Sequence, residues 1–324
     1  MISRPRPPGK AAGVDSLRKN GHHESGMPES RVVVVGRPGI LAPSGDLETE
    51  LVRRAIERGF CLLTGETKVP AAVARLFRPA DRVGIKVNTI GGPLISTRPE
   101  TALALAQTLI AGGIPAGQIA VWDRTNRELR AAGYRLAEGS REIRILGTDT
   151  AGVGYGRDLV SHRGIGSLFS ALQADFATAS ISLAILKDHG MAGITAGLKN
   201  YFGAVHNPNK YHDNHCDPFV AEVFDVPLVR EKHRLTVVDA LRVQFHRGPS
   251  FHAKWADACG QLIFSLDPVA ADSVGRDLLE RLRRAKGLPS LREEGREPGY
   301  LATAEGLKLG RARREDITLV EEKI

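Results

Sequence analysis

The chain has 324 residues, of which 42% are hydrophobic, so it is long enough to form one large domain or two smaller ones. Its formal net charge is +8, which favours anionic ligands, but the sequence has no RNA-binding aromatic motif, zinc-finger spacing or basic heptad, so nucleic acid is disfavoured as a partner. The 3 cysteines lie far apart without a C-x-x-C pair, which argues against an iron–sulfur cluster within this chain.

Residues 1–30 are rich in proline, glycine, serine and basic residues, which predicts a disordered basic tail. They lack the apolar segment of a secretory signal, so we expect a cytoplasmic protein. No apolar run is long enough to span a membrane, so no membrane contact is expected.

The first predicted elements are a strand and a helix. The β-branched run at 32–35 predicts a buried strand. The sequence "DLETELVRRAIERG" predicts a helix over 46–58, capped by Asp46 and stopped by Gly59. Residues 60–65, "FCLLTG", fit either a short strand or a helix–turn connection.

Residues 81–123 read as a strand, a loop, a helix and a second strand, which is the pattern of a βαβ unit. The helix begins near Pro99 and ends at the Gly112–Gly113 pair. Parallel strands are expected in such a unit, and ligands bind beyond the carboxyl ends of such strands.

The remaining chain continues the α/β pattern. We expect a strand ending at Asp149, a loop and helix over 156–176, a buried strand ending near Lys187, and later strands that include one ending at Asp239. Asp267 reads as the N-cap of a further helix. The expected fold is α/β, with mainly parallel sheet flanked by helices, either as one domain or as two lobes over 31–155 and 156–324.

Two polar groups follow the early strands. Lys86 ends a strand and Asn88 follows it, while Arg98 stands beside a helix N-terminus fixed by Pro99. Helix N-termini and arginine both bind carboxylates and phosphates, so this group predicts an anion or cofactor site. Asp123 ends the next strand, where it either binds a ligand or caps the following helix.

The segment 186–218 concentrates the residues suited to chemistry. Its glycines allow close backbone approach to a ligand, and lysine and histidine suit proton transfer near neutral pH. We therefore expect catalytic or cofactor-binding roles here. The candidates for catalysis are Lys187, His189, Lys199 and His206, and those for cofactor binding are Asn200 and Lys210.

The motif "HDNH" ends this segment. His212 and His215 lie three residues apart, which fits one helix face and a shared divalent metal, with Asp213 as a further ligand. Histidine pairs at this spacing also arise by chance, so a purely structural interpretation stays open.

Several stretches together resemble the bacterial domain-of-unknown-function family 362. They include "DRVGIKVN", "STRPE", "LKDHGMAGITAGLKNYFGAVHNPNKYHDN" and "DPVAAD". Members of that family are often linked to ferredoxin domains or carry twin-arginine signals, and this sequence departs from both patterns. The resemblance implies a ferredoxin-type protein as a possible partner.

A shorter stretch, "TRPETALALAQTLIAGGIPAGQIAVWD", is similar to a segment of the lactate racemase family. That resemblance implies a nickel-pincer nucleotide held by Lys187 or Lys199. It also implies a substrate carboxylate gripped by Arg98, with His189 and His206 as acid and base.

The interpretation we favour is an enzyme on a small anionic substrate, a carboxylate or a phosphate. It would use lysine and histidine for acid–base or hydride chemistry as an isomerase, a racemase or an oxidoreductase, with or without a metal or a lysine-tethered cofactor. The alternative is a non-catalytic protein that binds metal or serves a redox partner.

Overall fold

The computed structural model describes residues 30–42 and 44–324. The predicted tail therefore lies outside the described residues, apart from Ser30, where the first strand begins. The strands are β1 Ser30–Gly36, β2 Val83–Lys86, β3 Ile119–Asp123, β4 Arg144–Gly147, β5 Val160–His162, β6 Ile165–Ser167, β7 Ala179–His189, β8 Gly193–Thr195, β9 His233–Gln244, β10 Ala256–Ser265 and β11 Ile317–Lys323. The α-helices are α1 Thr49–Thr64, α2 Val69–Leu76, α3 Pro99–Ala111, α4 Asn126–Ala131, α5 Gly197–Asn200, α6 Phe219–Asp225, α7 Pro227–Arg230, α8 Pro268–Ala285 and α9 Tyr300–Gly306.

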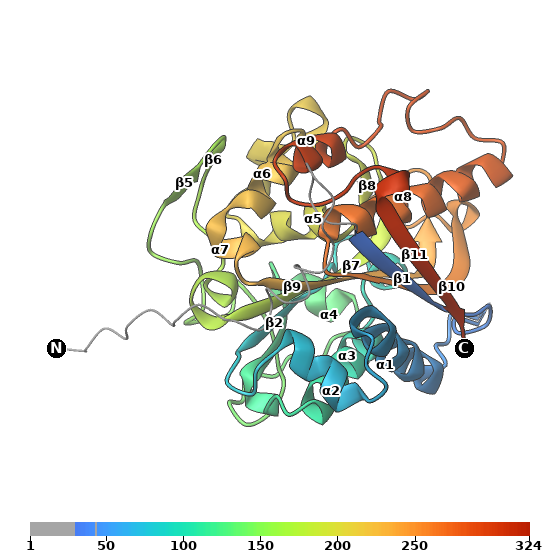
Figure 1. Ribbon diagram of the computed structural model, residues 1–324. Helices are drawn as coiled ribbons and strands as arrows, with labels where there is room; N and C mark the ends of the chain where they lie inside the picture. Colours follow the sequence, from blue (N-terminus) through green and yellow to red (C-terminus); the bar gives the residue numbers. More distant parts are fainter. Residues whose placement is uncertain (1–29, 43) are drawn as a thin grey trace, which may run out of the picture.

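One mixed sheet runs through the molecule in the order β11-β1-β10-β9-β7-β2-β3-β4, with β8 paired to β7 (Figure 1). The pairs from β9 to β4 are parallel, and so is the pair of β1 with β11. β10 runs antiparallel to both of its neighbours, and β8 is antiparallel to β7. The α/β fold with mainly parallel sheet is confirmed, and the sheet joins strands from both predicted lobes.

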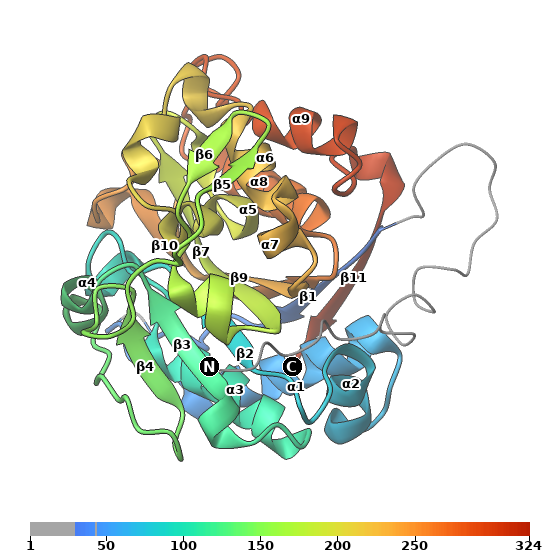
Figure 2. The same cartoon turned by 90° about the vertical axis from the view of Figure 1, so that its left-hand side faces the viewer.

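Helices cover both faces of this sheet. Figures 1 and 2 show α1, α2 and α3 on one side and α5, α6, α8 and α9 on the other. Alternate residues of one strand therefore enter different cores: Val33 and Val35 pack on the α1 side, while Val32 and Val34 pack on the α8 side. Central strands such as β7 are buried along most of their length for the same reason, and they read as continuous apolar runs.

The first helix differs from its predicted bounds. α1 begins at Thr49 without a side-chain cap from Asp46, and it continues through Gly59 to end at Gly65, where φ is +76°. Gly59 lies where α1 crosses the sheet, since a Cβ there would come within 2.5 Å of the Phe264 ring. This glycine therefore serves close packing rather than helix termination.

Two other local predictions were wrong. Residues 156–176 form the β5–β6 hairpin and a short π-helical turn, Leu172–Phe176, instead of a loop and a longer helix. β9 continues to Gln244, so Asp239 lies inside the strand and not at its end. The predicted N-cap of α8 is confirmed, because Asp267 accepts hydrogen bonds from the N–H groups of Val269 and Ala270.

Candidate functional site

The carboxyl ends of β2 and β3 carry a buried ion pair. Lys86 Nζ lies 2.7 Å from Asp123 Oδ1 and also donates to the Val87 carbonyl at 2.6 Å. Asp123 Oδ2 accepts from both the backbone and the hydroxyl of Thr89. Burial alone would raise the pKa of Asp123, but the charge and hydrogen bond of Lys86 outweigh it and lower that pKa.

Asn200 completes this cluster from α5, on the other side of the ion pair. Its Oδ1 accepts from Lys86 Nζ at 3.2 Å, and its Nδ2 donates to the Lys86 carbonyl at 2.8 Å. The three protons of the Lys86 ammonium thus have three protein acceptors. Gly203 covers the pair closely, since a Cβ there would lie 2.6 Å from Lys86 Nζ. The cluster holds α5 on the sheet edge and leaves Lys86 without a proton for an anionic ligand.

Lys187, at the end of β7, is buried beneath the loop that joins β2 to α3. Its Nζ donates to Asn88 Oδ1 at 3.1 Å and to the carbonyls of Ile90 and Ile95. Burial lowers the pKa of Lys187 to about 7. The structure thus brings together two predicted site residues, Lys187 and Asn88, but Lys187 uses its hydrogen bonds to hold this loop.

Lys199, on α5, meets His212 at the same end of the sheet. Its side chain is only 6% exposed, and its Nζ lies 3.3 Å from His212 Nε2 and 4.1 Å from the centre of the Phe202 ring. The thiol of Cys216, which is buried, also bonds to this amine. Burial lowers the pKa of Lys199 to about 8. This amine therefore exchanges protons much closer to neutral pH than an ordinary lysine.

The tautomer of His212 follows from its two partners. Its Nδ1 lies 3.0 Å from the carbonyl of Pro208, which can only accept, so Nδ1 carries a proton. Burial and the nearby charge of Lys199 lower the pKa of His212, so the ring is neutral near pH 7 and Nε2 has a free lone pair. Lys199 is thus the donor in the Lys199–His212 hydrogen bond.

His189 stacks on His212, with ring centres 5.8 Å apart and planes inclined by 24°. Its Nδ1 accepts from the N–H groups of Met191 and Ala192, so the ring proton is on Nε2. Burial and the charge of Lys199 lower the pKa of His189 to about 3. His189 is therefore a neutral hydrogen-bond donor near pH 7 and a weak base.

The other predicted residues lie outside this Lys199–His212–His189 cluster. Arg98 directly precedes α3, a helix on the opposite face of the sheet from α5 (Figure 1), and donates to the Gly45 carbonyl at 3.0 Å. His206 is exposed and contacts the edge of Tyr155. Lys210 is also exposed and donates to the Gly166 carbonyl.

The predicted metal motif does not form a joint site. His215 has a φ of +58° and its Nδ1 bonds the Met191 carbonyl, while His212 bonds Pro208 and Lys199; Asp213 is exposed. Within residues 30–42 and 44–324, no group of three or more His, Cys, Asp or Glu side chains could hold a metal ion.

A nucleotide tethered to a lysine does not fit these residues either. The amines of Lys187 and Lys199 are buried against protein groups that a nucleotide would have to displace.

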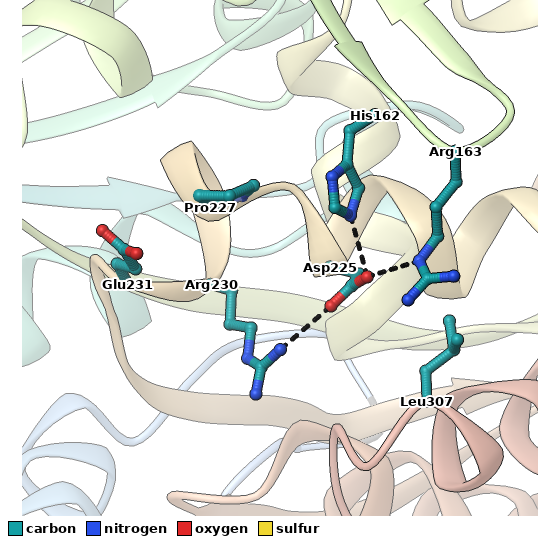
Figure 3. A pocket seen from close by; sticks show the side chains of 7 residues that line it. All are labelled: His162, Arg163, Asp225, Pro227, Arg230, Glu231 and Leu307. Atoms are coloured by element: carbon teal, nitrogen blue, oxygen red, sulfur yellow. Dashed lines mark hydrogen bonds and ion pairs between the residues drawn. The ribbon is translucent and has the colours of Figure 1, made fainter.

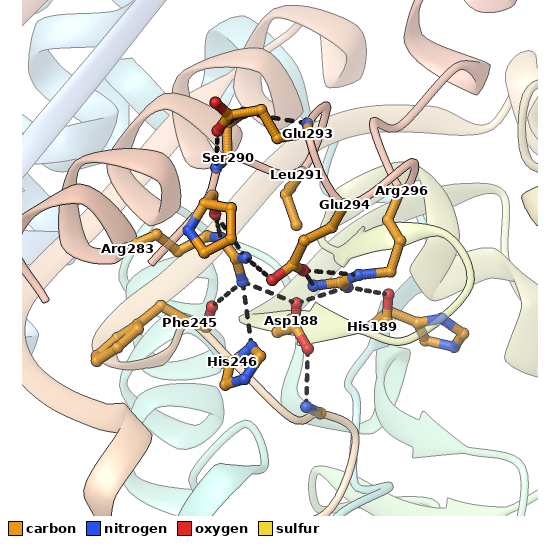
Figure 4. A network of polar contacts seen from close by, with 12 residues as sticks. Asp188, His189, Phe245, His246, Arg283, Ser290, Leu291, Glu293, Glu294 and Arg296 are labelled. Atoms are coloured by element: carbon orange, nitrogen blue, oxygen red, sulfur yellow. Dashed lines mark hydrogen bonds and ion pairs between the residues drawn. The ribbon is translucent and has the colours of Figure 1, made fainter. Parts of the chain in front are cut away.

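A buried network of ion pairs and hydrogen bonds, which the sequence did not reveal, holds the backbone next to the site (Figure 4). Asp188 Oδ1 lies 2.9 Å from Arg296 Nη1, and its Oδ2 accepts from the Gly248 N–H. Arg296 also donates to the His189 carbonyl at 3.1 Å. Arg283, fully buried on α8, donates to the Phe245 and Pro289 carbonyls. The network fixes the backbone of His189 to the C-terminal segment.

Asp272, on α8, fixes α5 in a similar way. Its two oxygens accept from the N–H groups of Gly197 and Leu198, at 2.6 Å and 3.1 Å. These N–H groups begin the helix that carries Lys199, so Asp272 determines where the amine lies. Burial raises the pKa of Asp272 to about 7. No short motif could have revealed this contact, because the two segments are more than seventy residues apart.

Comparisons with known proteins give one family match. A family model described as "Domain of unknown function (DUF362)" matches residues 83–277, a range that contains Lys199, His212 and His189. No curated protein matches the chain. A solved structure, that of a Thermotoga maritima protein studied as a structural genomics target, is similar at 11% identity with a TM-score of 0.44. The match covers 74% of this chain and 59% of the Thermotoga chain, so this chain spans about three fifths of the length of that protein. In the part of the chain that the structure describes, no helix is both long and apolar enough to cross a membrane.

Proposed function

This chain belongs to the DUF362 family, and from the polar residues within the matched range we propose an enzyme that transfers a proton on a small anionic substrate. The Lys199–His212–His189 cluster would be its site. The observation that carries the proposal is that the buried amine of Lys199 lies 3.3 Å from Nε2 of His212.

Lys199 is suited to the proton-transfer step. An ordinary lysine, with a pKa of 10.5, is almost fully charged at neutral pH and cannot act as a base. Burial lowers the pKa of Lys199 to about 8, so an appreciable neutral fraction exists near pH 7. The neutral amine accepts a proton from a substrate carbon or hydroxyl, and the resulting ammonium attracts the anionic part of the substrate.

The two histidines take different roles in this proposal. His212 accepts a hydrogen bond from Lys199 through Nε2 and keeps the amine in place. His189 is neutral with its proton on Nε2, so it would donate a hydrogen bond to a substrate oxygen on which negative charge develops. Both rings are partly exposed, whereas Lys199 is buried, so a substrate would reach the amine from the side of the two rings.

Hydrogen–deuterium exchange tests the proposal without knowledge of the product. The protein would be incubated in D₂O with lactate, malate, alanine and dihydroxyacetone phosphate, and proton NMR would follow the signals of the C–H groups beside a carbonyl or carboxylate. A base at Lys199 removes the proton from carbon and solvent returns a deuteron, so we expect one of these signals to decay. Lys199→Met should abolish the decay and His189→Gln should slow it.

Two exposed residues provide matched controls, Lys68→Met and His252→Gln, and both variants should exchange at the wild-type rate. Exchange that persists in Lys199→Met would remove the lysine from the mechanism. Absence of exchange together with absence of saturable binding for all four compounds would overturn the proposal.

A further inference from the structure

A second polar cluster surrounds Asp225, at the C-terminal end of α6 (Figure 3). Three side chains converge on its carboxylate: His162 Nε2 at 2.8 Å and Arg163 Nε at 2.7 Å reach Oδ2, and Arg230 Nη1 at 3.1 Å reaches Oδ1. His162 and Arg163 come from the tip of the β5–β6 hairpin, while Arg230 ends α7. The cluster therefore joins three elements that are separate in the sequence.

Both arginines keep unused donors. Arg163 contacts Asp225 through Nε alone and Arg230 through Nη1 alone, and the described residues offer no partner to the other N–H groups of either guanidinium. Figure 3 shows these groups on two sides of Asp225, with Leu307 beneath Arg163. The side chains are 46% and 50% exposed, so a ligand can reach them from solvent.

Two guanidinium groups face a single carboxylate at the centre of this cluster. Asp225 is 5% exposed and its carboxylate already accepts from three side chains, whereas two guanidinium groups face it. Glu231 also lines the pocket, but Figure 3 shows its carboxylate turned away from both arginines. No other described carboxylate forms an ion pair with either arginine, so both guanidiniums keep donors for an anionic ligand.

The hairpin tip is held in an uncommon conformation. Arg163 has a φ of +50°, which non-glycine residues seldom adopt and which costs energy. The next residue, Gly164, donates its N–H to Glu222 Oε2 at 3.0 Å, and a Cβ at Gly164 would lie 2.6 Å from that oxygen. The turn is thus docked on α6 in a way that fixes the direction of the Arg163 side chain before any ligand binds.

The space beside the arginines has the size of a small-molecule site. The pocket has a volume of about 420 Å³, within the range of roughly 300–1,000 Å³ that such sites occupy. Pro227 and Leu307 line it together with the charged residues. A bare inorganic anion would fill only part of this volume, and the two apolar side chains suit a small organic group beside the anion.

We propose that this pocket, which we call the Asp225 pocket, binds the phosphate group of a small phosphate monoester. Arginine matches phosphate through paired N–H groups, and the oxygens of a tetrahedral group can accept from two guanidiniums that approach from different sides. A carboxylate offers two oxygens and one negative charge, whereas a phosphate monoester offers three oxygens and more negative charge to the two guanidiniums. Asp225 acts as a positioning residue that orients both arginines. The proposal does not depend on proton transfer at Lys199.

Isothermal titration calorimetry on the full chain tests this assignment with three probes: inorganic phosphate, glycerol 3-phosphate and acetate. We expect saturable binding of both phosphates, tighter for the ester, and none for acetate. Loss of the charged donors in Arg230→Met should weaken glycerol 3-phosphate binding about tenfold or more. The affinity of Arg230→Lys, which keeps the charge but loses the paired N–H groups, should lie between those of the wild type and Arg230→Met.

The controls separate binding from folding. Arg127, an exposed arginine elsewhere on the surface, gives a matched variant, Arg127→Met, that should bind like the wild type. Glu231→Gln should bind at least as tightly, because it removes a negative charge from the lining. Acetate binding equal to that of phosphate would overturn the phosphate assignment. Wild-type affinity in a folded Arg230→Met variant, or no binding of either phosphate, would mean that the cluster only docks the hairpin.

Discussion

Lys187 Nζ lies 3.1 Å from Asn88 Oδ1 in a buried position where its hydrogen-bond acceptors are uncharged oxygens. None of the described carboxylates forms an ion pair with this amine, in contrast to Lys86, which pairs with Asp123. Lys86 ends β2, and Lys187 lies near the end of its parallel neighbour β7, where burial lowers the pKa of Lys187 to about 7. Both lysines are 1% exposed, so they differ in their partners and not in the depth of burial.

The first prediction concerns the pH dependence of stability in Lys187→Met. An unfolded lysine holds its proton up to about 10.5, whereas the folded one loses it above about 7, so folding must expel a proton between these values. This penalty is largest below about pH 7 and shrinks as the pH rises. Between about pH 7 and pH 9.5, the free energy of unfolding of the wild type should therefore rise by about 3 kcal/mol relative to that of Lys187→Met.

Urea unfolding at several pH values measures this gain. The exposed variant Lys68→Met should give a curve parallel to that of wild type. Parallel curves for Lys187→Met as well would mean that the buried amine stays charged throughout this range.

The second prediction concerns Asp239, whose Oδ2 is buried and has no hydrogen-bond partner. Burial raises the pKa of Asp239 to about 6. The protonated carboxyl group therefore favours the folded state at low pH, and this contribution to stability is lost as the pH rises through 6. Asp239→Asn should be more stable than wild type by about 3 kcal/mol near pH 7, with a smaller difference near pH 4. Thermal melts at both pH values test this, with the exposed Asp158→Asn as control; equal differences at the two pH values would contradict it.

A third prediction follows from the cap that Asp272 provides to α5. Asp272→Ala would leave the buried N–H groups of Gly197 and Leu198 without their acceptors, at a cost of about 1–3 kcal/mol for each group. We expect a loss of several kcal/mol in urea unfolding and a shift in the titration of Lys199. A variant as stable as wild type would show that water or another side chain replaces the cap.

The fourth prediction tests the close approach of Gly203 to the Lys86–Asp123 pair. The Cβ of Gly203→Ala would lie 2.6 Å from Lys86 Nζ, so the pair must move, at a cost of about 1–3 kcal/mol. Gly306→Ala serves as the matched control, because it lies in α9 with open space around it and should gain about 0.5–1 kcal/mol. Urea unfolding of both variants gives the comparison, and equal stability of the two would contradict the packing argument.

A fifth prediction gives the pH profile of the proposed proton transfer. The neutral amine of Lys199 is the base, so the exchange rate should rise with pH and level off above about 8. His212→Gln should change the midpoint of this profile because it alters the partner of the amine. A rate independent of pH between about 6 and 9 would exclude Lys199 as the base.

The sequence predicted which edge of the sheet carries the polar side chains, but it did not predict on which face of the sheet each of them lies. Strands ending at Lys86, at Asp123 and near Lys187 were predicted. β2 and β3 do end at Lys86 and Asp123, whereas β7 continues to His189, and the three strands are neighbours in the sheet. Alternation along each strand then directs Lys86 toward α5 and Lys187 toward the loop before α3, and this depends on a register that the sequence does not reveal. Arg98 directly precedes α3 and Lys199 lies on α5, and these two helices cover opposite faces of the sheet.

The details of the His-rich loop also depend on backbone geometry. His212 and His215 were predicted to share a helix face, but Asn214, His215 and Cys216 all have positive φ, so the chain turns between the two rings. The supporting residues Asp272, Arg283 and Arg296 lie far along the chain from the segments they hold. Nothing in their local sequence distinguishes them from ordinary helix or loop charges.

The position of β1 has a consequence for how the molecule folds. β1 lies between β10 and β11, and Val33 pairs with Phe264. At about 5–20 residues per second, the ribosome needs on the order of ten seconds or more to make the partners of β1 after β1 itself. During that time its unpaired edges are free to associate with other chains, and closing so long a loop slows the search for the native pairing. The sheet is therefore expected to close late, when β10 and β11 enclose a strand made long before them.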